Sequence, residues 1–218
     1  MNSQDPEVAE ASLAAAAPSR PDDAVALVLV NLGTPSAPEP GPVRAFLREF
    51  LSDRRVIEMN PFLWKPILEG IILRVRPREV SRKYRSIWLE QGSPLMHYTR
   101  EQARLLGERL PGVRVEVAMR YGQLSIGAAL DRLHAQGVRR VAVLPAYPHY
   151  SATTVASIND AVCAWIGRNR DGFEMRLHRS FPASPAYIDA LAVALTHAHH
   201  LQTQRRQQLA GLATAWEQ

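Results

Sequence analysis

Four apolar runs alternate with longer, amphipathic segments along this chain. The first run, residues 24–30, consists of Ala, Val and Leu without interruption, which is typical of a strand buried on both faces. The run at 113–120 alternates between apolar and polar residues and predicts a less central strand. Two further runs, at 139–144 and 174–179, predict a third and a fourth strand.

The segments between the strands have the spacing of helices. Val43 and Phe46 begin an apolar face that predicts a helix over about residues 42–51. An apolar stretch at 61–75 predicts a second helix that ends before Pro77, because proline breaks a helix interior. Five more helices are predicted over residues 79–88, 97–109, 126–136, 153–168 and 184–200.

This alternation of strands and helices predicts an α/β fold. Parallel strands joined by helices form a Rossmann-like sheet covered on both faces, with the loops after the strands at one edge. We expect one such domain over residues 24–200. Residues 1–23, rich in Ala, Ser, Pro and Asp, are predicted to be disordered. The Gln- and Arg-rich residues 201–218 are predicted to form a tail outside the domain.

Composition narrows the range of functions. The chain has 218 residues, and 46% of them are hydrophobic, which allows a substantial core. The net charge of +5 comes from arginines spread over many segments, so no nucleic-acid partner is expected. The single cysteine, Cys163, fits a reducing compartment. No run approaches the roughly 20 apolar residues of a membrane span, and we expect a cytoplasmic location.

Three loops carry the candidate chemistry because each follows a predicted strand. They are residues 31–35, 120–122 and 145–151, and open α/β sheets bind ligands at this edge. None contains the Gly-x-Gly-x-x-Gly turn or the Gly-Lys-Ser/Thr of nucleotide-binding sheets, so a nucleotide is not the expected ligand. No metal site is predicted, since the histidines at 197, 199 and 200 cannot share one helix face.

Four motifs stand in and between these loops. They are VNLGTP at 30–35, YRSIW with GSPL at 84–95, AMRYG at 118–122, and PAYPHYSATT at 145–154. In this order, over about residues 24–196, they resemble the ferrochelatase family. The resemblance implies the first of two Rossmann-like domains of a lyase that inserts Fe²⁺ into a porphyrin during haem biosynthesis. It also implies that Fe²⁺ is a substrate and that no cofactor is permanently bound.

The resemblance further implies which residues face the porphyrin. The matching positions are Arg76, Tyr84, Ser93, Arg120 and Tyr121, with Tyr150 and His149 as additional loop contacts. Arginine suits the propionate carboxylates of a porphyrin, and tyrosine offers an aromatic face to the macrocycle.

Several of these positions also have a structural interpretation. Ser93 equally suits the N-cap of the helix that follows it. Tyr84 can pack against a neighbouring helix, and Arg76 and Arg120 can be solvated charges. The apolar stretch at 61–75 is either core or an exposed lip of the porphyrin site. The arginines beside it suit anionic lipid head groups, so peripheral membrane contact is expected.

The end of the sequence departs from the family pattern. In ferrochelatases a histidine in a Ser-x-His motif and a later glutamate carry the proton and metal chemistry. No Ser-x-His motif and no Glu-bearing domain follows residue 200. The catalytic residues are therefore unknown. We expect impaired or absent Fe²⁺ insertion, as a truncated gene or a changed reading frame would cause.

Two alternatives stay open beside a working ferrochelatase. One is a non-catalytic fragment that binds porphyrin, and the other is a Rossmann-like domain with a different ligand. The sequence does not distinguish protoporphyrin from coproporphyrin as the substrate.

Overall fold

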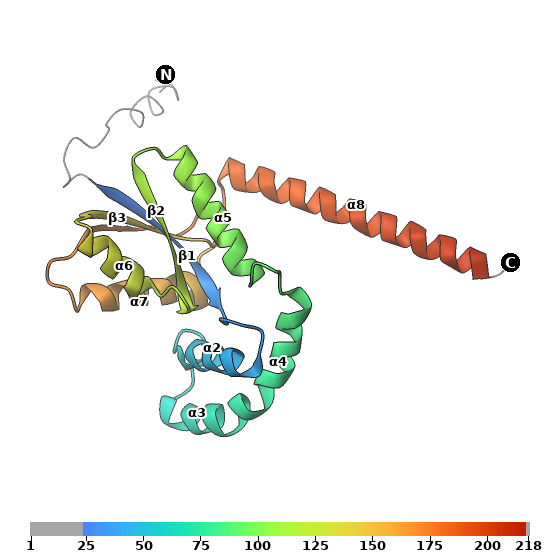
Figure 1. Cartoon of the computed structure of the whole chain (residues 1–218), viewed down its shortest axis with the longest axis horizontal. Coiled ribbons are helices and arrows are strands. Elements are labelled where there is room, and N and C mark those ends of the chain that lie inside the picture. Colours follow the sequence, from blue (N-terminus) through green and yellow to red (C-terminus); the bar gives the residue numbers. More distant parts are fainter. Residues whose placement is uncertain (1–23, 217–218) are drawn as a thin grey trace, which may run out of the picture. The chain divides into compact units, whose positions relative to one another are not determined.

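The computed structural model describes residues 24–216, with side chains as far as residue 205 (Figure 1). It divides into two compact units, the first ending at Arg179 and the second beginning at Ser180. The elements of the first unit are β1 (Val25–Thr34), α2 (Pro40–Ser52), α3 (Pro61–Ile67), η2 (Leu68–Ile72), α4 (Leu73–Ile87), α5 (Pro94–Arg109), β2 (Val113–Gly122), α6 (Ile126–Ala135), β3 (Arg140–Pro145), η3 (Ala152–Ala156), α7 (Ser157–Ile166) and β4 (Glu174–Leu177). The second unit contains α8 (Pro185–Trp216).

The four strands form one parallel sheet in the order β2-β1-β3-β4. β1 is central, since Val25 pairs with Val113 of β2 on one side and with Arg140 of β3 on the other. β4 pairs with β3 and forms one edge, while β2 forms the other. The predicted α/β fold is confirmed, and β2 has the less central position that its alternating pattern indicated.

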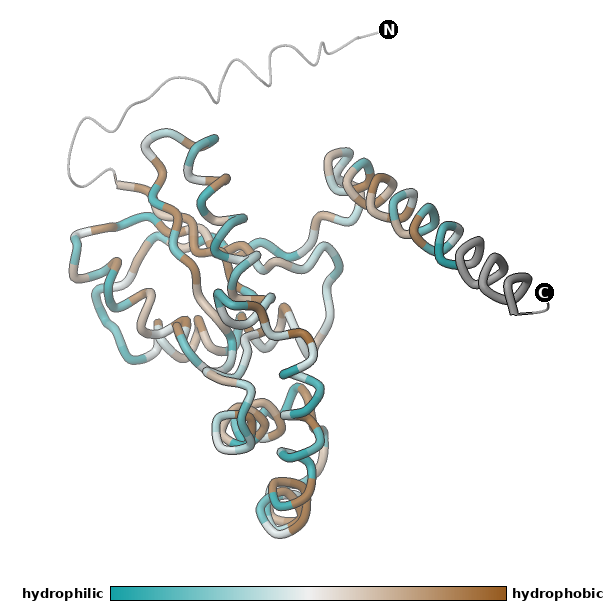
Figure 2. Tube along the Cα trace, turned by 45° about the vertical axis from the view of Figure 1, so that its right-hand side comes forward, coloured by the Kyte–Doolittle hydropathy of each residue, from teal (hydrophilic) through white to brown (hydrophobic). Residues whose placement is uncertain are grey.

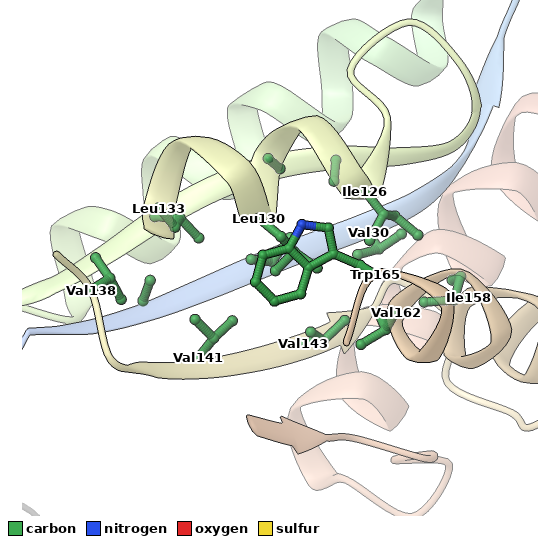
Figure 3. Close-up of a cluster of buried hydrophobic side chains, with 14 residues drawn as sticks. Val30, Ile126, Leu130, Leu133, Val138, Val141, Val143, Ile158, Val162 and Trp165 are labelled. Atoms are coloured by element: carbon green, nitrogen blue, oxygen red, sulfur yellow. The ribbon is translucent and has the colours of Figure 1, made fainter. Parts of the chain in front are cut away.

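The main core lies between the sheet and helices α6 and α7 (Figure 3). Even-numbered residues of β1, such as Val28 and Val30, point into it because side chains alternate along a strand. Trp165 of α7 lies among them, and its indole N–H donates to the Asp131 carboxylate at 2.7 Å. Asn31 points to the other face and donates to Thr99 of α5 at 3.0 Å, so helices cover both faces of the sheet.

A second hydrophobic cluster packs the helices α2 and α4 onto the end of β2. It includes Phe46 of α2, Leu73 of α4 and Tyr121 of β2, all of them buried. The ring of Phe50 meets the ring of Tyr121 edge-on, with 5.2 Å between their centroids. This packing places the loop after α2 beside the carboxyl edge of the sheet.

The helix predicted to stop before Pro77 continues through it. α3, η2 and α4 form one uninterrupted helical run from Pro61 to Ile87, and Pro77 is buried inside α4. In a regular helix the ring of Pro77 would clash with the carbonyl of Leu73. The π-helical turn η2 widens the helix immediately before Leu73 and distorts the backbone there, so the proline is accommodated.

Two strands extend into segments predicted to be loops. β1 continues to Thr34 and β2 to Gly122, because Gly33 pairs with Tyr121 and Thr34 with Gly122. Gly33 has a φ of 109°, and a Cβ at this position would lie 1.9 Å from the carbonyl oxygen of Tyr121. Only glycine fits this close approach of two strands.

The last helix is longer than predicted. α8 begins at Pro185, as expected, but it continues beyond His200 to Trp216. Gln, Arg, Leu and Ala are all favourable helix residues, so the tail continues the helix. The tail has no apolar face, which is why its sequence did not predict this extension. The segment predicted to be disordered, residues 1–23, lies outside the described residues.

Candidate functional site at the carboxyl edge of the sheet

The ends of β1, β2 and β3 meet at one edge of the sheet. Thr34 at the end of β1 pairs with Gly122 of β2, and Val30 of β1 pairs with Pro145 of β3. The loop between α2 and α3 is joined to this edge by the side chain of Asp53. The three segments predicted to carry chemistry therefore lie together.

The Asp53 carboxylate forms the centre of a buried polar network. Its Oδ2 accepts hydrogen bonds from Nη2 of Arg120 at 2.6 Å, from the hydroxyl of Tyr121 at 2.7 Å and from the hydroxyl of Ser157. Its Oδ1 accepts from the backbone N–H of Arg55 at 2.7 Å. One carboxylate thus joins the loop after α2, strand β2 and the start of α7.

The guanidinium of Arg120 is held at several points. Its Nε lies 3.0 Å from the carbonyl oxygen and 2.6 Å from the hydroxyl of Ser157, and its Cζ lies 4.5 Å from the centre of the Tyr121 ring. The side chains of Arg120 and Asp53 are 20% and 8% exposed. Arg120 is therefore part of a nearly buried ion pair, not a solvated charge at a strand end.

Hydrogen bonds decide the charge state of this network. Burial alone would raise the pKa of Asp53, but the hydrogen bonds from Ser157, Tyr121 and the Arg55 N–H, together with the charge of Arg120, lower it below its usual value. Burial raises the pKa of Tyr121 to about 12, and the acceptor Asp53 acts in the same direction. At neutral pH the cluster holds one negative and one positive charge and a neutral phenol.

Asp53 also lines an open pocket of about 600 Å³. The other walls come from residues 54, 55 and 57–61 of the loop and the start of α3, and from Ala152 and Asp160. Nε and Nη2 of Arg55 donate to the two carboxylate oxygens of Asp160 at 2.7 and 3.0 Å. Arg54 is exposed on the wall and forms no ion pair with any residue that the structure describes.

The porphyrin-facing candidates on α4 differ in exposure. Arg76 is exposed, whereas Tyr84 is half-buried in the second hydrophobic cluster, and its ring meets that of Trp88 edge-on at 6.1 Å. Burial raises the pKa of Tyr84, so its phenol is neutral under ordinary conditions. Arg76 is exposed to a ligand from solution, and Tyr84 is only partly accessible.

Ser93 stands at the N-cap of α5 and is 6% exposed. Its backbone has the extended conformation of an N-cap, but its side chain makes no capping hydrogen bond. Ser93 therefore occupies the N-cap position, but its hydroxyl does not cap the helix.

The loop after β3 contributes exposed and buried rings. His149 and Tyr150 are exposed, and the guanidinium of Arg179 lies 4.5 Å from the centre of the Tyr150 ring. Tyr147 points inward; its buried hydroxyl has no hydrogen-bond partner, and burial raises its pKa with a further contribution from Tyr121. Tyr147 therefore lies close enough to Tyr121 of the Asp53 network to be influenced by it.

The sequence indicated Arg120 and Tyr121 but missed their two partners. Asp53 follows a predicted helix, where a lone carboxylate is normally solvated, and Ser157 lies within a predicted helix. Neither position carries a local signal, because their contacts with Arg120, Tyr121 and each other join residues 36 to 104 positions apart. Among the described residues, no group of three or more His, Cys, Asp or Glu side chains is placed to hold a metal ion.

Comparison with known proteins identifies the family. The sequence model of the ferrochelatase family matches residues 24–213, which is most of the chain.

The chain belongs to the ferrochelatase family.

Several curated ferrochelatases are close in sequence. Ferrochelatase 1 of Shewanella oneidensis is 48% identical over 177 residues, which cover 79% of this chain and 53% of the relative. The ferrochelatase of Methylibium petroleiphilum is 50% identical over 170 residues, covering 76% and 47%. That of Yersinia enterocolitica is 44% identical over 171 residues, covering 78% and 53%. The chain spans about half the length of the curated ferrochelatases it matches.

Family membership confirms the resemblance drawn from the four motifs. It also agrees with the parallel α/β sheet. The Asp53 network and its pocket therefore lie at the carboxyl edge of the sheet in a ferrochelatase-type domain. This is the edge at which α/β sheets bind ligands.

Proposed function

We propose that this chain binds a porphyrin and takes part in inserting Fe²⁺ into it. The observation that carries the proposal is the family match over residues 24–213, with relatives named ferrochelatase at 44–50% identity. Fe²⁺ is a substrate in this proposal, and no resident cofactor is invoked. The proposal applies equally to protoporphyrin and to coproporphyrin as the substrate.

The geometry supports a division of roles among the candidate residues. A porphyrin presents carboxylates at one side, which need accessible cations. Arg120 is already neutralised by Asp53, whereas Arg54 on the pocket wall and Arg76 on α4 are exposed. We therefore assign carboxylate contacts to Arg54 and Arg76, and a supporting role to Arg120 and Tyr121. Tyr84, Ser93, His149 and Tyr150 are proposed as contacts to the macrocycle.

A fluorescence titration tests porphyrin binding. We expect a saturable change when the purified chain is added to protoporphyrin or to coproporphyrin. Arg54→Gln should weaken binding roughly tenfold, the size of a charge-assisted hydrogen bond. Arg168→Gln, at an exposed arginine in the turn after α7, is the matched control and should bind as the unmodified chain does. No saturable change with either porphyrin would refute the proposal.

An anaerobic assay with Fe²⁺ then tests insertion. Conversion of porphyrin to haem is followed by absorbance, with the same concentrations of chain and porphyrin as in the titration. Turnover supports an enzyme, whereas saturable binding without turnover favours the non-catalytic porphyrin-binding alternative.

We also propose that the chain contacts membrane surfaces. Large apolar side chains of the α3–α4 run are exposed: Phe62 at 89%, Val75 at 68% and Leu63 at 66%. Hydrophobic and hydrophilic residues are interspersed along this run (Figure 2). Arg74, Arg76 and Arg78 lie on the same run and suit anionic head groups. Among residues 24–216, no helix combines the length and apolar character that crossing a bilayer requires. The contact proposed is with the membrane face, and the compartment we propose is the cytoplasm.

A further inference from the structure

The Asp53 carboxylate connects the loop that lines the pocket to two other chain segments. Its own loop forms one wall, and its hydrogen bonds reach Arg120 and Tyr121 at the end of β2 and Ser157 at the start of α7. Separate elements thus converge on one oxygen atom, Oδ2. Removing this carboxylate would release all of these contacts together.

Two ion pairs hold the loop that lines the pocket. The Asp53–Arg120 pair is mostly buried, and the Arg55–Asp160 pair is exposed. Arg55 pairs with Asp160 through side chains that are 43% and 52% exposed. Exposed ion pairs contribute little to stability. The Asp53–Arg120 pair is far less exposed, and breaking such a pair leaves an uncompensated charge. The buried Asp53–Arg120 pair therefore contributes more than the Arg55–Asp160 pair to fixing the position of the loop of residues 53–60.

Arg120 and Tyr121 are themselves held by this carboxylate. Tyr121 is 1% exposed, so its hydroxyl finds its partners inside the protein, in Asp53 and Ser157. A second link, from the N–H of Gly122 to the Glu49 carboxylate at 2.7 Å, ties the end of β2 to α2. The end of β2 thus makes its polar contacts with α2, with the loop after α2 and with α7.

We propose that Asp53 is a positioning residue of the candidate site: it fixes Arg120 and Tyr121 and keeps the loop of residues 53–60 docked as the pocket wall. The link to porphyrin affinity rests on the proposed function, and the docking of the loop does not. Asp53 acts through its partners and is not assigned a contact with the substrate.

The test uses Asp53→Asn, which keeps the shape of the side chain and removes its charge. The groups that face the Tyr121 phenol are Asp53, Arg120, Ser157 and Tyr147. Without the carboxylate, the unpaired Arg120 charge favours the phenolate. The pKa of Tyr121, about 12 in the intact network, should therefore fall. Alkaline absorbance titration, with Tyr121→Phe to identify its signal among the six tyrosines, measures this change.

Hydrogen exchange at neutral pH measures the docking of the loop. In Asp53→Asn, the amides of residues 53–60 should exchange faster, while those of the central strand β1 should not change. Porphyrin affinity should fall roughly tenfold, and Asp53→Glu should recover part of it because it restores the charge. Asp131→Asn, which removes a different carboxylate that accepts a side-chain hydrogen bond, is the control and should leave the Tyr121 titration unchanged.

Three results would overturn the proposal: an unchanged Tyr121 titration, unchanged exchange in residues 53–60, or faster exchange throughout β1 as well, which would mean a general loss of stability. Unchanged porphyrin affinity with a loosened loop would overturn the link to binding. If the unmodified chain binds no porphyrin, the proposed function fails, and exchange and tyrosine titration still decide the role of Asp53.

Discussion

Gly33 and Tyr121 meet where β1 and β2 end, and their contact leaves no space for a side chain at position 33. The left-handed φ of 109° and the position of the Tyr121 carbonyl act in the same direction. The glycine is thus needed for close approach as well as for conformation. It holds together the two strand ends from which Arg120 and Tyr121 reach the network.

A pair of glycine substitutions tests this reading. Gly33→Ala should destabilise the protein by more than about 2 kcal/mol, because it adds strain and a clash with backbone. Gly41→Ala in α2 is the control: no atom lies within 4 Å of its added Cβ, so its effect should be neutral or stabilising by up to about 1 kcal/mol. Urea unfolding measures both, and equal midpoints for the two variants would contradict the prediction.

At the scale of elements, α7 both closes the core and starts at the site. Trp165 near its end packs between the helices and the sheet, while Ser157 at its beginning reaches Asp53. The rings of Trp165 and Phe173 stack with 5.0 Å between their centroids, which ties α7 to the segment before β4. Core packing at one end of the helix therefore supports polar geometry at the other.

Truncating the tryptophan measures this support. Trp165→Ala should cost about 3–5 kcal/mol of unfolding free energy, since it opens a cavity and leaves Asp131 without its indole partner. Phe62→Ala, at an aromatic side chain that is 89% exposed, should stay within about 0.5 kcal/mol of the unmodified chain. A Trp165→Ala variant as stable as Phe62→Ala would show that α7 is not held by this packing.

The elements themselves were largely predictable, because their signals are local. The continuous apolar run at 24–30 predicted the central strand, and Gly137 marked the end of α6, where it has a φ of 79°. The passage of the helix through Pro77 was not predictable, because a π-helical turn has no sequence signature comparable to a cap. The extension of β1 depended on pairing with β2, which the residues of β1 alone do not specify.

Only part of the candidate site was predictable, because local sequence does not specify contacts between distant segments. Arg120 and Tyr121 stand in a recognisable motif at a strand end, whereas Asp53 and Ser157 become meaningful only when distant segments meet. The sequence predicted a propionate contact for Arg120, and our proposal gives this residue a supporting role instead. The structure adds the fact that its charge is already balanced.

At the scale of the whole molecule, charge and exposed apolar surface combine. The chain has a net charge of +5, and its α3–α4 run exposes large apolar side chains near arginines. Exposed apolar patches of this kind mark interaction surfaces, and anionic membranes satisfy both properties.

Sedimentation with lipid vesicles tests membrane contact. The chain should bind vesicles that contain anionic lipid, and binding should weaken as salt is raised because the charges are screened. Phe62→Ser combined with Leu63→Ser should reduce the bound fraction several-fold, as about 1.5–3 kcal/mol accompanies burial of each such side chain. Val193→Ser on α8, which is 71% exposed, is the control. Equal binding by both variants would exclude the α3–α4 run as the contact.

The Asp53 network also has a consequence for the order of assembly. During synthesis the chain emerges from its amino terminus, so Asp53 is made long before Ser157, which lies 104 positions later. At about 5–20 residues per second, this carboxylate waits several seconds for its last partner. Until α7 has emerged, the loop lacks one of its anchors, and we expect the pocket wall to be among the last parts of the unit to settle.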